Sequence, residues 1–345
     1  MSRLSYLSNR ALNLFERKLG KTRLLSRPPE LTIEPTLQCN SDCIMCNRSF
    51  NREEDKLAQG FVSWEVLNKT ASFWPSAHIL FGGFGESLMH PQYLKMLNAM
   101  KSAGASVYTY SNGILLSEKM AKGLVDAEMN KISISIGGAT RETYHKIRGV
   151  DAFDTVVQNL RTLNEYKKQR KTRFPMISFN VVAMESVMPE ISGILKLAKE
   201  LGVDEMLMPN LVVQGDSLRH EYIWSKREKN SVIIEAAEKY AKSLSIKFHP
   251  PVLDEREGYC WDLFNRLNIN WDGSVMSCAM ERFILGDLHT QTISEIWNSP
   301  GLIKLRSDFL HGKAAEHCPK CACRNLTQES LLNPWYNARS KADKV

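Results

Sequence analysis

The sequence predicts an α/β fold in which a parallel sheet closes wholly or partly into a barrel and a small α+β unit follows it. Six short apolar runs alternate with longer helical stretches between residues 31 and 209. Such alternation is typical of parallel sheets with right-handed crossovers. After about residue 212 the rhythm changes, and five of the eight cysteines lie beyond that point. This change indicates the appended unit.

Each of the six apolar runs has the length and composition of a buried strand. The runs are LTIEP (31–35), HILFGG (78–83), SVYTYS (106–111), KISISIGG (131–138), MISFNVVA (176–183) and VDEMLMP (203–209). Helices are expected between them, near residues 63–73, 91–103, 117–128, 151–169 and 188–201. Gly104 and Gly202 stand where two of these helices end. Because chemistry in such folds collects at the carboxyl ends of the strands, we expect site residues just after each run.

Residues 1–27 are expected to form a basic amphipathic helix. They hold seven Arg and Lys residues against Glu16 alone, and so carry +6 of the net charge of +7. Apolar residues recur there at helical spacing, namely Leu4, Leu7, Ala11, Leu14 or Phe15, and Leu19. We favour a helix that docks on the protein's own body and leaves its basic face in solvent; peripheral contact with an anionic membrane surface is the alternative. Since the rest of the chain is nearly neutral, the charge predicts no nucleic-acid partner.

The second part of the chain carries a different pattern. A long helix is expected over 226–244, and Phe248-His249-Pro250-Pro251 indicates a linker or boundary. LNINWDGSVMSC (267–278) alternates around Asp272-Gly273, which predicts a hairpin with a two-residue turn. The expected units are the N-terminal helix (1–30), the barrel (31–225), a connecting helix and linker (226–258), the small cysteine-bearing unit (259–325) and a tail (326–345).

The cysteines and the hydropathy bear on the compartment. No apolar run approaches the roughly 20 residues that a membrane span needs, and no signal-peptide core follows Met1. Clustered cysteines suit metal binding in a reducing compartment better than disulfides. We therefore expect a cytoplasmic protein.

The stretch CNSDCIMC places Cys39, Cys43 and Cys46 on a polar loop directly after the first expected strand. A zinc site needs a fourth ligand, and the nearest histidine, His78, belongs to another element. A [4Fe–4S] cluster held through three irons leaves its fourth iron open to a small molecule. The loop therefore favours an open cluster over zinc.

This spacing after a leading strand closely resembles the radical S-adenosylmethionine superfamily. The resemblance implies a partial (β/α)6 TIM-like barrel and a [4Fe–4S] cluster whose open iron is chelated by S-adenosylmethionine (SAM). It further implies that one-electron reduction cleaves SAM to a 5′-deoxyadenosyl radical, which abstracts hydrogen from a substrate C–H bond. An electron donor of the flavodoxin or ferredoxin type would be a partner.

Three later strand ends carry further elements of the resemblance. GGFGE (82–86) is similar to the family's G-x-G-E-P with Ser87 in place of proline, YSNG (110–113) to T-N-G, and SISIGG (133–138) to S-x-D-G with Gly137 in place of aspartate. The resemblance implies that the backbone of the first element meets the methionine amino group and that Ser135 and Arg148 hold its carboxylate. Without the resemblance, GGFGE would be an ordinary glycine-rich turn, YSNG an ordinary Asn-Gly turn and Arg148 a solvent-facing arginine. The predicted SAM-binding residues are Gly83, Gly85, Glu86, Ser111, Asn112, Ser135 and Arg148.

The C-terminal cysteines resemble the SPASM/twitch appendage of the same superfamily. Cys260, Cys278, Cys318 and Cys321 are enough to ligate a second cluster or a zinc ion. Because only Cys323 is left over, the resemblance is to the twitch form, and we expect one auxiliary [4Fe–4S] cluster. Cys323 is then either a hydrogen-atom donor to a substrate radical or a spare thiol beside the cluster.

The resemblance implies a radical enzyme that dehydrogenates or epimerises a small polar metabolite, similar to a sugar or an aminocyclitol. Modification of a ribosomally made peptide is the alternative. About 30 residues precede the first expected strand, which we expect to be too few for a leader-binding domain. A non-catalytic iron–sulfur scaffold or sensor is a third hypothesis, and it would have no need of Glu86, Ser135 and Arg148 at neighbouring strand ends.

Overall fold

The computed structural model describes residues 2–46, 48, 60–211, 216–253, 256–257, 262–278, 283–313 and 325–326. In this part of the chain, the strands form a ten-stranded sheet in the order β11-β10-β9-β1-β2-β3-β4-β5-β6-β7 and a two-stranded sheet of β12 and β8. The strands are β1 (Glu30–Ile33), β2 (His78–Phe81), β3 (Ser106–Ser111), β4 (Lys131–Ser135), β5 (Met176–Asn180), β6 (Glu205–Leu207), β7 (Lys247–His249), β8 (Arg256–Glu257), β9 (Arg266–Ile269), β10 (Ser274–Met276), β11 (Ile284–Asp287) and β12 (Asn325–Leu326).

The parallel part of the large sheet runs from β9 through β1 to β7, and each neighbouring pair in this series is parallel. All six predicted runs are strands of this sheet. The predicted linker differs, because Phe248 and His249 pair with β6 as strand β7. Asn210 fixes the chain just beyond β7, where its Nδ2 donates to the carbonyl of Val252 at 2.8 Å. A three-residue strand before two prolines gives too little periodicity to be seen in the sequence.

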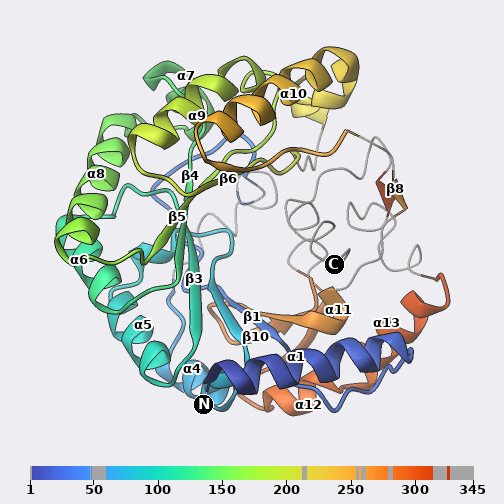
Figure 1. The fold of residues 1–345 in the computed structure, drawn as a ribbon. Helices are drawn as coiled ribbons and strands as arrows, with labels where there is room; N and C mark the ends of the chain where they lie inside the picture. Colours follow the sequence, from blue (N-terminus) through green and yellow to red (C-terminus); the bar gives the residue numbers. More distant parts are fainter. Residues whose placement is uncertain are drawn as a thin grey trace.

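Helices cover the outer face of the curved sheet (Figure 1). Alternate strand residues point to opposite faces, and those on the outer face, such as Ile33, Ile79 and Phe179, are fully buried. The α-helices are α1 (Ser2–Lys18), α4 (Trp64–Thr70), α5 (Tyr93–Ser102), α6 (Glu118–Asp126), α7 (Arg141–Arg148), α8 (Phe153–Gln169), α9 (Ile191–Glu200), α10 (Arg227–Ser243), α11 (Asp262–Asn265), α12 (Ile293–Trp297) and α13 (Pro300–Leu310), with 3-10 turns η1 (Ala71–Ser76), η2 (Ser87–Met89), η3 (Met188–Glu190), η4 (Asp216–Glu221) and η5 (Ile223–Lys226).

The C-terminal hairpin extends the barrel sheet. Strand β9 pairs with β10 in antiparallel fashion, which confirms the predicted hairpin. The predicted two-residue turn is wrong, because the N–H of Asn270 donates to the carbonyl of Ser274 at 2.9 Å and leaves residues 271–273 as the turn, with Gly273 at a φ of 87°. Strand β9 also pairs in parallel with β1. An ion pair joins these two strands, with 2.6 Å between Arg266 Nη2 and Glu30 Oε2, and Arg266 is almost fully buried. The sequence did not predict this attachment of the hairpin to the first strand.

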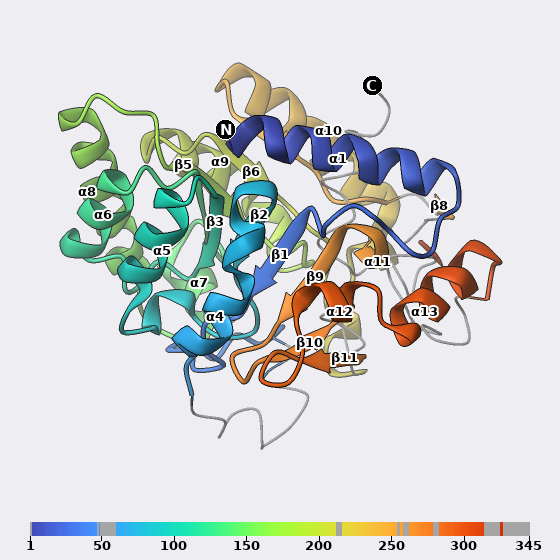
Figure 2. The same cartoon turned by 90° about the horizontal axis from the view of Figure 1, so that it is seen from below.

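Helix α1 docks on the protein's body, but with a polar side. Asn13 and Glu16 are the buried residues of this helix among those whose side chains are described. Asn13 Nδ2 donates to the carbonyl of Phe264 at 2.8 Å, and the Glu16 carboxylate accepts the N–H of Leu25 at 2.6 Å. The basic residues Arg10 and Lys18 are exposed, as expected, yet so is the apolar side of the helix. Helix α1 runs along the lower side of the ring in Figure 1 and crosses the near side of the molecule in Figure 2. No helix in the described ranges is long and apolar enough to cross a membrane.

Candidate functional site

A cavity of about 180 Å³ lies beside the segments that follow β1, β2, β3 and β4. Its walls bring together all three cysteines of the polar loop and all seven predicted SAM-binding residues. The lining residues are Cys39, Ser41, Cys43, Met45, Cys46, Gly83, Phe84, Gly85, Glu86, Tyr110, Ser111, Asn112, Ser135 and Arg148. Residues up to 109 positions apart in the chain therefore share one site, because parallel strands end at the same edge of the sheet.

The end of α7 anchors the cysteine loop. The N–H of Ile44 donates to the carbonyl of Ile147 at 3.1 Å. Directly after this helix, Gly149 has a φ of 66°, and a Cβ at this position would lie 2.2 Å from the carbonyl oxygen of Asp42. A side chain here would be both strained and in collision with the loop backbone. The cysteine loop and the last turn of α7 are thus closely packed.

Asn112 ties the same loop to the end of β3. Its Nδ2 donates to Asn40 Oδ1 at 2.6 Å and to Ser41 Oγ at 3.1 Å, and lies 4.0 Å from Cys39 Sγ. Its Oδ1 in turn accepts the N–H of Ile114 at 3.0 Å. A predicted binding residue therefore acts here as a brace for the cysteine loop.

Glu86 connects the ends of β2 and β3. Its carboxylate accepts the Ser111 hydroxyl at 2.8 Å and the N–H of Asn112 at 2.6 Å. Burial raises the pKa of Glu86, and these hydrogen bonds oppose the rise by stabilising the charged form. In the same loop, a Cβ on Gly85 would lie 1.9 Å from the carbonyl oxygen of Thr36, so the close approach of the two backbones requires glycine.

Glu34 and Tyr110 are site residues that the sequence analysis did not assign. Glu34 Oε1 accepts the N–H of Phe84 at 2.7 Å and so holds the glycine-rich loop. The signal available was a carboxylate directly after an apolar strand. Tyr110 lines the cavity, and its place one residue before Ser111, which also lines the cavity at the end of β3, was the available signal.

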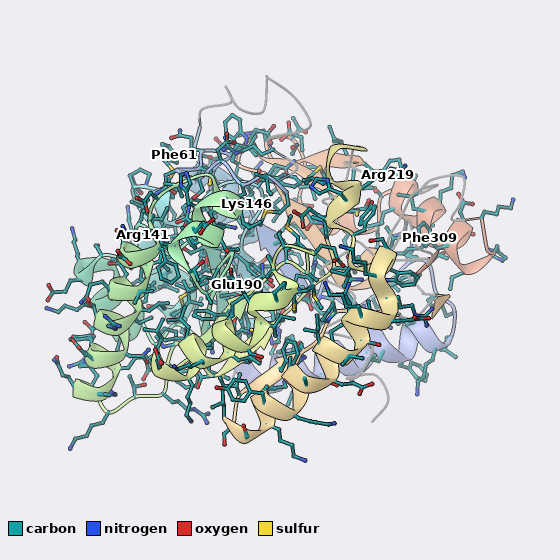
Figure 3. The ribbon with its side chains drawn as sticks, turned by 90° about the horizontal axis from the view of Figure 1, so that it is seen from above. Phe61, Arg141, Lys146, Glu190, Arg219 and Phe309 are labelled. Carbon is teal, nitrogen blue, oxygen red and sulfur yellow. The ribbon has the colours of Figure 1, made fainter. Side chains whose placement is uncertain are left out.

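Arg148 lies in the last turn of α7, with its side chain 8% exposed. Its Nε has no hydrogen-bond partner among the described residues. Burial favours the neutral form of Arg148, but the charges of Cys43, Tyr144, Cys39 and Cys46 together outweigh this effect and raise its pKa. Glu190 supports the start of the helix by accepting the N–H of Ala139 at 2.6 Å and the Thr143 hydroxyl. Figure 3 labels Glu190, together with Arg141 and Lys146 of α7.

The three thiols fit a cofactor that is larger than a single ion. Burial raises the pKa of Cys39, Cys43 and Cys46 above the ordinary value of a thiol, so thiolates there need a nearby positive partner. In the described ranges no three His, Cys, Asp or Glu side chains converge closely enough to hold one metal ion. The thiols instead share the wall of a cavity with Arg148, a buried cation with an unused donor.

The C-terminal cysteines are less completely described. Cys278 follows β10 and is half-buried. Cys260, Cys318, Cys321 and Cys323 lie outside the described residues. The predicted ligand set of the auxiliary cluster therefore remains a prediction.

Two family models match the sequence. The Radical SAM superfamily model matches residues 33–185, and the SPASM model, described as an iron–sulfur cluster-binding domain, matches residues 260–322. The first match lies within the expected barrel (31–225) and leaves residues 186–225 outside it, and the second lies within the expected cysteine-bearing unit (259–325).

Relatives of full length are similar to this chain. A tungsten-containing aldehyde ferredoxin oxidoreductase cofactor-modifying protein of Pyrococcus furiosus is 22% identical over 334 residues, covering 91% of this chain and 93% of that protein. An AdoMet-dependent heme synthase of Methanosarcina barkeri is 25% identical over 341 residues, covering 87% and 92%.

A solved structure shares the fold. Streptococcus suis SuiB bound to its precursor peptide SuiA superposes with a TM-score of 0.64 at 16% identity, covering 87% of this chain and 71% of that one. The two family-model matches show that the chain belongs to the radical SAM superfamily, whose members use a [4Fe–4S] cluster with SAM, and that it carries a SPASM domain, which holds an auxiliary iron–sulfur cluster.

Proposed function

We propose that this radical SAM enzyme dehydrogenates or epimerises a small polar metabolite, similar to a sugar or an aminocyclitol. When bound, the reduced cluster supplies the electron that splits SAM into methionine and the 5′-deoxyadenosyl radical that removes a substrate hydrogen. The protein's own contribution is to hold SAM and substrate in a fixed relation, which is where the rate comes from.

We assign the roles at the cavity as follows. Cys39, Cys43 and Cys46 hold three irons, and Ser135 and Arg148 bind the methionine carboxylate. The shared cavity supports this assignment, as does the unpartnered Nε of Arg148, since a guanidinium fork suits a carboxylate. The backbone of 83–85 receives the methionine amino group, while Glu86, Ser111 and Asn112 position the loops around it.

The polar inner face of the sheet carries the proposal of a hydroxylated substrate. Tyr110 lines the cavity and pairs with Ser133, which pairs with Ser178 on the next strand. Paired residues of neighbouring parallel strands point to the same face, so both hydroxyls lie on the side of Tyr110. Both serines are buried, and neither hydroxyl has a hydrogen-bond partner among the described residues. Buried hydroxyls normally form hydrogen bonds, so we expect water or a ligand with several hydrogen-bonding groups beside them.

Charged groups continue this polar face. Glu205 pairs with Ser178 and accepts a hydrogen bond from Lys131, and His249 Nε2 lies 3.7 Å from its second oxygen. An inner face with alternating charges and hydroxyls favours a substrate that presents several polar groups over one that is mainly apolar.

Peptide modification is the second candidate function. It is supported by the similarity to SuiB, whose solved structure contains the precursor peptide SuiA. For either function we propose a flavodoxin- or ferredoxin-type electron donor and a cytoplasmic location, where thiols stay reduced. We also propose a peripheral contact of residues 1–27 with a membrane surface, and that Cys323 is a hydrogen-atom donor in the epimerase case.

Cleavage of SAM tests the radical reaction. Anaerobically reconstituted protein reduced with dithionite is expected to release 5′-deoxyadenosine from SAM even without substrate. A preparation with intact clusters that forms none would refute the proposal. Iron analysis on the same samples distinguishes two cubane clusters, about eight irons per chain, from one cluster with zinc, about four.

Turnover in heavy water tests the outcome at carbon. Epimerisation places solvent deuterium on the product carbon, whereas dehydrogenation does not. A panel of aminocyclitols and sugars is compared with candidate precursor peptides, and turnover of peptides alone would favour the second candidate. If Cys323 is the donor, Cys323→Ala is expected to form deoxyadenosine and no epimer; epimer formation at the normal rate contradicts the donor role.

A further inference from the structure

The outward side of α1 exposes apolar side chains that no described part of the body covers. Helical spacing places Leu7, Ala11, Leu14 and Phe15 on one side of the helix. Leu7 is 52% exposed and Phe15 is 61% exposed. Of the eleven large hydrophobic residues that are exposed in the described ranges, Leu7, Leu14 and Phe15 lie on this one side of α1. Such a concentration marks an interaction surface.

The polar contacts of the inward side fix this orientation. Asn9 Oδ1 accepts the N–H of Arg27 at 2.8 Å, and Asn13 donates to both Ser26 Oγ and the Phe264 carbonyl. Tyr6 stacks on His78 with ring centroids 4.0 Å apart. Rotating the apolar side inward would break each of these contacts. The exposure of the apolar side is therefore built into the docked helix.

The charge around the apolar side selects the partner. Arg10, Lys18, Lys21 and Arg23 are exposed along the helix and the turn after it. Glu16, the one acidic residue of positions 1–27, faces the body and accepts the N–H groups of Leu25 and Ser26. The outward surface thus combines leucine and phenylalanine with positive charge alone. This combination fits an anionic bilayer, where apolar side chains enter the acyl boundary and basic ones meet the headgroups.

We propose that α1 binds the protein to the surface of an anionic lipid bilayer, with Leu7, Leu14 and Phe15 at the acyl boundary. The inference develops the peripheral contact proposed above and does not depend on the reaction. Tyr6 contacts His78, the first residue of β2, whereas the cavity lies beyond the last. The bilayer would therefore meet the end of the barrel opposite the cavity, so the contact locates the enzyme and does not deliver a lipid into the site.

Vesicle co-sedimentation of the anaerobically loaded full chain tests this surface. Vesicles of phosphatidylcholine alone are compared with vesicles that contain about 30% phosphatidylglycerol. We expect binding to the anionic vesicles, weakened by raised salt. We expect two double variants to lower the partition coefficient about tenfold or more each. Leu7→Glu/Phe15→Glu removes the burial of apolar side chains in the bilayer, and Lys18→Glu/Lys21→Glu removes the attraction to the anionic headgroups.

Val232→Glu is the matched control, since Val232 is 67% exposed on α10, on another side of the ring in Figure 1. It should bind vesicles like the wild type. Deoxyadenosine formation in all variants should stay at the wild-type level, so a failure of the reaction and a failure of membrane binding are told apart. The proposal would be overturned if the protein did not bind anionic vesicles, if it bound neutral vesicles equally well, or if both α1 variants bound like the wild type. So would a lipid-free dimer that Leu7→Glu/Phe15→Glu abolishes, because the surface would then belong to a second copy of the chain.

Discussion

At the scale of single residues, Arg148 shows how a buried side chain is fixed for binding one ligand group. It is a buried cation beside three cysteines, with an Nε donor that no described residue uses. Arg148→Lys keeps the charge but loses the planar fork. We expect the SAM concentration for half-maximal deoxyadenosine formation to rise about 10- to 100-fold, the equivalent of one charged hydrogen bond of about 1.5–3 kcal/mol.

The iron content of Arg148→Lys should match the wild type, which separates SAM binding from cluster loss. Arg141→Lys is the control, because Arg141 lies at the exposed start of the same helix and pairs with Asp154. If Arg148→Lys leaves the SAM dependence unchanged, Arg148 does not bind the cosubstrate carboxylate.

Glu205 carries the clearest pH dependence. Burial raises its pKa, but a hydrogen bond from His249 and the charge and hydrogen bond of Lys131 together lower it to about 2. Because the folded-state pKa lies below the ordinary value of 4.5, the carboxylate's stabilisation is complete above about pH 4.5 and is lost as the pH falls towards 2. Glu205→Gln should therefore lower the melting temperature by several degrees at pH 8 and also at pH 5.5.

Thermal unfolding of the loaded protein at the two pH values measures this effect. Glu200→Gln, on the exposed side of α9, is expected to change the melting temperature by less than about 1 °C. A Glu205→Gln effect that disappears between pH 8 and pH 5.5 would show that another group, not this carboxylate, titrates.

At the scale of elements, α1 reverses the usual pattern of a docked helix. Asn13→Leu leaves the Phe264 carbonyl without its donor and should destabilise the fold by about 1–3 kcal/mol. Leu7→Asn, on the exposed side, should cost less than about 0.5 kcal/mol. The ranking of the two melting temperatures is the measurement. The opposite ranking would mean that the apolar side packs inward.

The same helix shows what periodicity leaves open. The spacing of its apolar residues predicted a helix with two different sides, but it does not tell which side packs on the protein. The contacts that decide this are distant in sequence, since the partners of Asn13 lie 13 and 251 positions away. The strands were predictable because five of the six apolar runs end at, or directly before, a glycine, asparagine or proline. Strand β7 was missed because it is three residues long and precedes Pro250.

Among site residues, Ser135 and Arg148 were found through a family motif, whereas Glu34 was missed because its role is a contact with the backbone of Phe84, 50 positions away.

At the scale of the whole molecule, the large sheet joins the two ends of the chain. Buried Arg266 of β9 and half-buried Glu30 of β1 form an ion pair between segments 236 positions apart. Arg266→Met removes this cation from the half-buried Glu30 carboxylate and should lower stability by about 1–3 kcal/mol. Arg266→Met/Glu30→Met should recover much of this loss, because no charge is then stranded.

Melting temperatures of the single and double variants, each with its iron content, measure this coupling. Arg170→Met is the control, because its pair with Asp126 is exposed and should contribute little. A double variant less stable than Arg266→Met would show that each residue acts independently.

The last turn of α7 has a thermodynamic consequence. It holds the cysteine loop through the Ile147 carbonyl and also carries Arg148. Where such a shared support lets a cofactor and a cosubstrate affect each other's affinity, they do so by the same factor in both directions. Saturating SAM is therefore expected to slow the release of iron to a chelator, and enzyme without an intact cluster to bind SAM less tightly. The oxygen tolerance of this enzyme would then depend on the cell's supply of SAM.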